Sequence, residues 1–130
     1  MRSVVLIVLS APMRIIVCTM LIAASMTAAD TGKQVTVNGW VLDSACAFTK
    51  GLTKPISRDC ALSCAKAGSP LVILQSDGSI YWPISEKMPA EGQNSRLLPY
   101  AGKQVTASGK LYNRGGSNAL VIESIKESAR

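Results

Sequence analysis

The sequence predicts a mainly β fold, a small five-stranded barrel with a short cysteine-bearing helix inserted after the first strand. Two segments, 32–41 and 102–111, match closely and alternate apolar and polar residues with the period of two that is typical of strands. A third segment, 71–84, has the pattern of a hairpin around an Asp-Gly turn. Aromatic residues make up 5% of the chain, so we expect the core of this single domain to be aliphatic.

The two matching segments are expected to be strands with equivalent positions in one barrel. In the first segment, Val35, Val37 and Val41 share one face. Each strand carries an internal glycine, Gly39 in the first and Gly109 in the second. A glycine within a strand indicates a sharp bend or the close approach of another backbone, as strongly coiled barrel strands require.

The segment 43–70 is expected to hold one short helix. Ser57 is a suitable N-cap, alanines favour a helix over the residues that follow, and Gly68 is a suitable terminator. The helix is therefore predicted over about 58–67, and it carries Cys60 and Cys64.

The hairpin that follows consists of two short apolar strands, 71–75 and 80–84. They flank the turn 76–79, whose Asp-Gly pair suits a tight turn because glycine tolerates positive φ.

The rest of the chain completes the barrel. Because prolines and glycines interrupt it, the stretch 85–100 is expected to be a loop with one helical turn near 95–98. The final strand, 119–126, follows a turn at 115–118. Five strands with a helix between the third and the fourth suit a Greek-key barrel of the oligonucleotide/oligosaccharide-binding (OB) type, with an open meander sheet as the alternative.

The first 29 residues have the pattern of a secretory signal peptide. They contain Arg2 and Arg14, no acidic residue, two short apolar runs, and small residues just before the expected cleavage site after Ala29. A start at Met13 would also give a complete signal. The apolar runs are shorter than the ~20 residues of a membrane-spanning helix. We therefore expect a mature chain of residues 30–130, without a transmembrane helix, that is periplasmic or secreted.

Composition limits the classes of function. The chain has no histidine, which excludes His-dependent catalytic triads and His-ligated zinc, and no paired carboxylates are evident, so we do not expect an enzyme. The mature chain, with 12 basic and 8 acidic residues, has a net charge of +4, which suits an anionic cell-surface polymer as a partner. An envelope protein is the other partner that we consider. Nucleic acid is not an expected partner outside the cytoplasm.

Three cysteines remain after removal of the signal with Cys18: Cys46, Cys60 and Cys64. Because exported chains meet an oxidising compartment, we expect a structural disulfide. Residues four apart on a helix have Cβ atoms about 5–6 Å apart, whereas a disulfide needs roughly 3.5–4.5 Å. Cys46 is therefore expected to pair with either Cys60 or Cys64.

Two other roles for these thiols stay open. All three thiolates could bind a soft metal, Zn(II) or Cu(I), with Asp43 or Asp59 nearby as a further donor. Alternatively, the unpaired thiol could be a redox group or could pair with another molecule.

A candidate ligand or partner surface combines aromatic and basic side chains. Strand alternation predicts that Ile80 and Trp82 point into the barrel, and that three aromatic side chains point outward. These three are Trp40, Tyr81 and Tyr112. The basic residues around the insertion are Lys50, Lys54 and Arg58, together with Lys66. The alternatives are an aromatic face covered by the cysteine-bearing helix and a solvated basic loop.

The cysteine pattern resembles a known group of proteins. Asp43-Ser44-x-Cys46, then Asp59-Cys60-Ala61-x-x-Cys64 and a closing Gly102-Lys103-x-Val105-Thr106 strand, is similar to small exported bacterial domains with an OB-like fold. The resemblance covers about 36–127, and it implies a fold and a location but no activity. Many members carry a histidine shortly before the paired cysteines, and this chain does not.

The sequence thus predicts an exported, non-catalytic OB-like module without a cofactor. This module has a binding or structural role and is stabilised by a disulfide. One alternative is a metal-binding or redox protein that uses the three thiolates. The other is an accessory subunit of an envelope complex.

Overall fold

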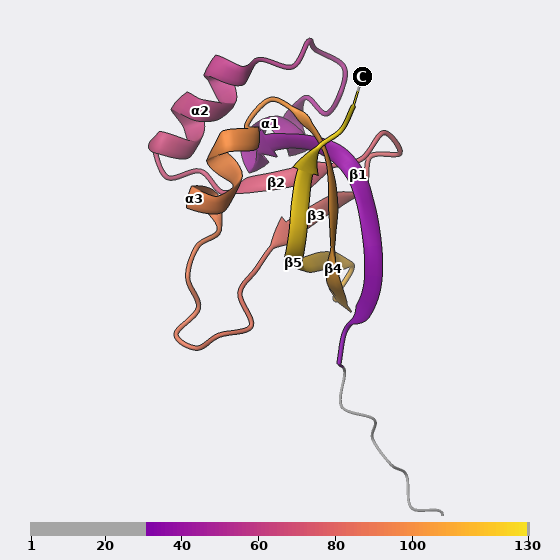
Figure 1. Ribbon diagram of the computed structural model, residues 1–130. Coiled ribbons are helices and arrows are strands. Elements are labelled where there is room, and N and C mark those ends of the chain that lie inside the picture. Colours follow the sequence, from indigo (N-terminus) through magenta and orange to yellow (C-terminus); the bar gives the residue numbers. More distant parts are fainter. Residues whose placement is uncertain (1–30, 130) are drawn as a thin grey trace, which may run out of the picture.

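A closed barrel of five strands forms the centre of the computed structural model, which describes residues 31–129 (Figure 1). The predicted signal peptide, 1–29, lies outside the described residues. The strands are β1 (Lys33–Asp43), β2 (Leu71–Leu74), β3 (Ile80–Pro83), β4 (Gln104–Arg114) and β5 (Ser117–Glu127). The predicted mainly β barrel is therefore confirmed.

The strand order around the barrel is β1-β2-β3-β5-β4, and β4 pairs back onto β1. Neighbouring strands are antiparallel except for β3 and β5, which run parallel. This is the OB-like Greek-key arrangement that the sequence predicts, with a helical insertion after the first strand.

β1 closes the barrel because its two halves pair with different strands. Residues 33–40 pair with β4, and residues 40–43 pair with β2. Gly39 lies at the changeover, where a Cβ atom would come 2.6 Å from the carbonyl oxygen of Leu74. Gly109 lies next to a register shift between β4 and β5, where the backbone of Val121 leaves no room for a side chain. Both glycines therefore permit the close backbone approach predicted for them.

The apolar side chains form two layers, one inside the barrel and one on its outer surface. The interior cluster consists of Val37, Val41, Ala65, Leu71, Ile73, Leu97, Val105, Ala107, Leu120 and Ile122. The outer cluster consists of Leu42, Ala47, Val72 and Leu74, with Trp40, Ile56, Ile80 and Trp82 packed against it. As expected, the buried residues of both clusters are aliphatic.

The direction predicted for the β3 side chains was wrong. Tyr81 packs against the interior cluster, whereas Ile80 and Trp82 pack against the outer one. The physical reason is that a helix covers the outer face of this strand pair, so both faces of β2 and β3 contact apolar side chains. An alternating pattern then does not distinguish inside from outside.

The helices gather at one end of the barrel (Figure 1). They are α1 (Ser44–Thr49), α2 (Arg58–Lys66) and α3 (Asn94–Leu97), which continues into a 3₁₀ turn at Leu98–Tyr100. The predicted helix after Ser57 is confirmed as α2, whereas α1 was not predicted. Within residues 31–129, no helix has the length and apolar character needed to cross a membrane.

Asn94 ties α3 to the end of the insertion. Its side-chain oxygen accepts a hydrogen bond from the backbone N–H of Leu71 at 2.8 Å, and its amide donates to the carbonyl of Ser69 at 2.8 Å. The last residues of the insertion are thus held where β2 enters the barrel.

The close approach at Gly39 predicts a strong effect of a single methyl group. Gly39→Ala should lower the free energy of unfolding by about 1–3 kcal/mol, because the new Cβ would overlap the Leu74 carbonyl. Urea denaturation followed by circular dichroism measures the change. Gly92→Ala is the matched control, since a Cβ there meets nothing within 4 Å and should leave the stability almost unchanged. Equal stability of the two variants would contradict this account of β1.

Candidate thiol–carboxylate site

Asp43 stands where β1 ends and α1 begins. Its side chain is 1% exposed, and its Oδ2 accepts a hydrogen bond from the backbone N–H of Cys46 at 3.1 Å. An aspartate at this position is a favourable N-cap because it satisfies an N–H group that the helix leaves unpaired. The backbone therefore fixes a carboxylate at the base of the insertion.

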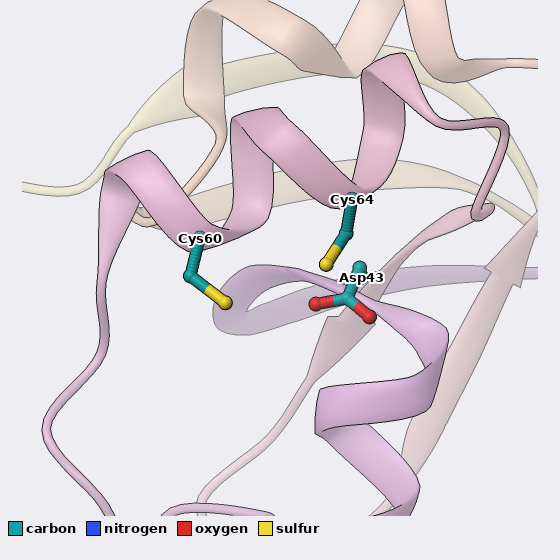
Figure 2. Close-up of side chains that lie close together, drawn as sticks. All are labelled: Asp43, Cys60 and Cys64. Carbon is teal, nitrogen blue, oxygen red and sulfur yellow. The ribbon is translucent and has the colours of Figure 1, made fainter.

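The helix α2 brings two thiols over this carboxylate. Cys60 and Cys64 are four residues apart, and both sulfur atoms point from α2 toward Asp43 (Figure 2). The two Sγ atoms and a carboxylate oxygen of Asp43 all lie within 4.8 Å of one another. The hydroxyl of Ser57 fixes the start of α2 by accepting the N–H of Cys60 at 3.2 Å. Cys60 is exposed and Cys64 is half-buried.

Cys46 stands beside this group of three donors. Its thiol hydrogen-bonds to the Asp43 carboxylate and also interacts with Cys60. The structure therefore brings all three predicted cysteines together, and of the two nearby acids it selects Asp43. All three are free thiols, so the expected bridge from Cys46 is not formed in this structure.

The carboxylate holds protons on its thiol neighbours. The hydrogen bond to Asp43, with burial as a second cause, raises the pKa of Cys46 to about 11 from an ordinary value of 9.0. Burial, followed by the negative charge of Asp43, also raises the pKa of Cys64. Folding favours the protonated form of Cys46. The contribution of this thiol to the free energy of unfolding is therefore present below pH 9 and is lost as the pH rises toward 11.

A cavity of about 180 Å³ opens beside the cluster. Asp43, Cys46 and Cys60 contribute to its lining, and so do Lys50 and Lys54. Its other lining residues are mostly apolar or small: Leu42, Gly51, Pro55, Ile56, Ser57 and Ala61.

The predicted basic group is divided between two roles. Lys50 and Lys54 are exposed and line the cavity. The Arg58 guanidinium instead donates to the carbonyl oxygen of Ala101 at 2.9 Å and to that of Pro99 at 3.4 Å. Arg58 therefore joins α2 to the segment before β4.

The three aromatic residues predicted as one outer surface are not brought together. Trp40 packs on the outer cluster and Tyr81 on the interior cluster. The hydroxyl of Tyr112 donates to Glu86 at 2.5 Å, in the loop after β3.

The aromatic contact that the sequence did not indicate joins α1 to β3: the rings of Phe48 and Trp82 have centroids 5.8 Å apart. Phe48 is 64% exposed. The one sequence feature that could have indicated this contact is the position of Phe48, four residues after Ser44 in a run without charged residues.

Comparisons with protein-family models, curated proteins and solved structures found no match to the chain. The chemistry of the site therefore has to be argued from its own groups. Two thiols and a buried carboxylate at mutual distances under 4.8 Å offer sulfur and oxygen donors to one cation. The thiol of Cys46 lies outside that group and could instead form a disulfide with Cys60.

The pKa of Cys46 gives a test of this geometry in the reduced, metal-free protein. Asp43→Asn keeps a good N-cap but removes the negative charge, so the pKa of Cys46 should fall. Since the thiolate is the reactive form, alkylation of Cys46 at pH 9 should be faster in the variant. Mass spectrometry of peptides alkylated with iodoacetamide across a pH series measures the pH at which the alkylation rate of Cys46 is half-maximal, which is the midpoint. A midpoint that is the same in both proteins would show that Asp43 does not act on this thiol.

Proposed function

We propose that the protein is an exported, non-catalytic OB-like module that binds a metal ion through Asp43, Cys60 and Cys64, with Cys46 beside them. The observation that carries the proposal is the convergence of these donor atoms within 4.8 Å at the junction of β1, α1 and α2. Export is inferred from the signal pattern of residues 1–29.

The charge of the cluster favours a cation. Asp43 is buried, and the two ion pairs within residues 31–129, Lys103 with Glu127 and Lys110 with Glu86, lie elsewhere. The pKa values of Cys46 and Cys64 are raised, the first mainly by its hydrogen bond to Asp43 and the second mainly by burial, with the negative charge of Asp43 as a further cause for both. A bound cation reverses this balance, since it stabilises the thiolates as well as the carboxylate, and the protons leave to solvent.

The donor set favours Zn(II) over Cu(I). Zinc accepts thiolate sulfur together with carboxylate oxygen in a tetrahedral arrangement, at about 2.3 Å for sulfur and 2.0–2.2 Å for oxygen. Copper(I) prefers soft thiolate or thioether ligands alone.

A second candidate function is the disulfide-stabilised module. It is favoured by the contact between Cys46 and Cys60, which come from different helices. A bridge between them would tie α1 to α2 and, in the chain-entropy model, would add about 3 kcal/mol of stability. The two candidates use the same thiols, so a metal-loaded protein and an oxidised protein are alternative states of one site.

Metal titration tests the first candidate. Reduced protein should bind one equivalent of Co(II), a spectroscopic substitute for Zn(II), with a sulfur-to-cobalt charge-transfer band. Cys60→Ser and Cys64→Ser should each weaken binding at least roughly a hundredfold, and Asp43→Asn at least roughly tenfold. Asp59→Asn is the matched control, because this acid is on the same helix but outside the group of donors, and it should bind normally. If reduced wild-type protein gave no charge-transfer band, the metal site would be refuted.

Peptide mapping after oxidation tests the second candidate. Metal-free protein in a glutathione redox buffer should form a bond between Cys46 and Cys60 and leave Cys64 free, because two cysteines four apart in a helix are too far apart to bridge. Zinc-loaded protein should oxidise more slowly. In Cys46→Ser, no intramolecular bridge is expected. A bond between Cys60 and Cys64 in the wild-type protein would contradict the geometry described for α2.

A further inference from the structure

The cavity beside the cluster combines groups that a bare cation site does not need. Lys50 and Lys54 line it together with Asp43, Cys46 and Cys60. Ammonium groups repel a bare cation and, while protonated, cannot act as metal ligands. They are complementary to an anion that enters the same cavity.

A bound metal would leave these lysines as the charges that face an incoming ligand. Asp43 is the acidic residue that lines the cavity, and it would be neutralised as a metal ligand. Arg58, the third basic residue of this segment, is held by backbone carbonyls instead. With two thiolates and the Asp43 carboxylate as ligands, a bound Zn(II) would have a net charge of −1, so the two lysines are the groups that would attract an anion.

The size and lining of the cavity favour an organic anion over a single inorganic ion. At ~30 Å³ for each water molecule, 180 Å³ corresponds to roughly six waters. Leu42, Pro55 and Ile56 provide apolar surface for a carbon skeleton. Cys60 lines the cavity and is exposed, so a ligand can reach the donors from solvent.

The number of donors leaves a coordination position to fill. Zinc takes four ligands, and sites with three protein ligands hold a water or a substrate in the fourth position. The group of mutually close donors contains Asp43, Cys60 and Cys64, and it does not include Cys46. The cavity is lined by Asp43 and Cys60 of this group, so it gives access to the metal position.

We propose that this cavity binds a small anionic thiol, whose sulfur completes the coordination of the metal and whose carboxylate pairs with Lys50 and Lys54. The inference rests on the proposed metal site. On binding, the thiol releases its proton to the buffer, and a metal–sulfur bond replaces a metal–water bond. No electron transfer is involved. The protein would thereby hold a metal as a mixed complex with a thiol of low molecular mass.

Matched probes test the two halves of the ligand. Cobalt-loaded protein should bind N-acetyl-L-cysteine in a 1:1 complex, with an increase in the sulfur-to-cobalt band and a ternary mass in native mass spectrometry. N-acetyl-L-serine, which lacks the thiol, should give no increase in the band. N-acetylcysteine amide, which lacks the carboxylate, should bind roughly tenfold more weakly.

Matched variants test the lysines. The double variant Lys50→Gln, Lys54→Gln should bind N-acetyl-L-cysteine roughly tenfold more weakly and the amide as well as wild-type protein does. Lys66→Gln, a lysine of α2 outside the cavity lining, is the control and should behave as wild type. Cobalt affinity measured in parallel separates damage to the metal site from loss of the anion contacts.

Each failure has a distinct meaning. If the protein binds no cobalt, both the proposed function and this inference fall. If the protein binds cobalt, three results would overturn this inference and leave the metal site standing. N-acetyl-L-cysteine could remove the metal from the protein, it could leave the charge-transfer band unchanged, or it could bind the double variant as tightly as the wild-type protein.

Discussion

The buried carboxylate of Asp43 joins the barrel to its insertion. Removing such a charge from water costs several kcal/mol unless hydrogen bonds compensate. Asp43 meets that requirement with the N–H of Cys46, in the first turn of α1, and with thiols from both α1 and α2. The arrangement of α1, α2 and the cavity between them therefore depends on one residue at the end of β1. A cation at this point would replace the thiol–carboxylate hydrogen bonds of α2 with bonds from the metal to Asp43 and to the thiolates of Cys60 and Cys64.

Much of the fold could be predicted from the sequence because its long strands carry simple signals. β1 and β4 alternate clearly, and their glycines lie where another backbone comes close. The start of α2 could be placed because Ser57 is a side-chain cap with a specific hydrogen bond. The spacing of Cys60 and Cys64 indicated that both thiols share one helical face, which is the basis of the site.

The rest depended on contacts between distant segments. The six residues of α1 are too few for a helical period, and the signal that precedes them is a single capping aspartate. Nothing local distinguished Asp43 from Asp59 as the acid near the thiols, because that choice is made by the packing of α2 against β1. The direction of Tyr81 was predicted wrongly because α1 covers the outer face of β2 and β3 and makes both faces apolar.

The two-layer packing also determines which part of the structure the intrinsic fluorescence of the protein reports on. The chain has two tryptophans, Trp40 and Trp82, and both pack against the outer cluster, where Phe48 of α1 contacts the second. The aromatic side chains against the interior cluster are tyrosines, Tyr81 and Tyr100. Tryptophan emission is therefore a local reporter of how α1 lies on the barrel. The signals of these two tyrosines carry the corresponding information about the interior.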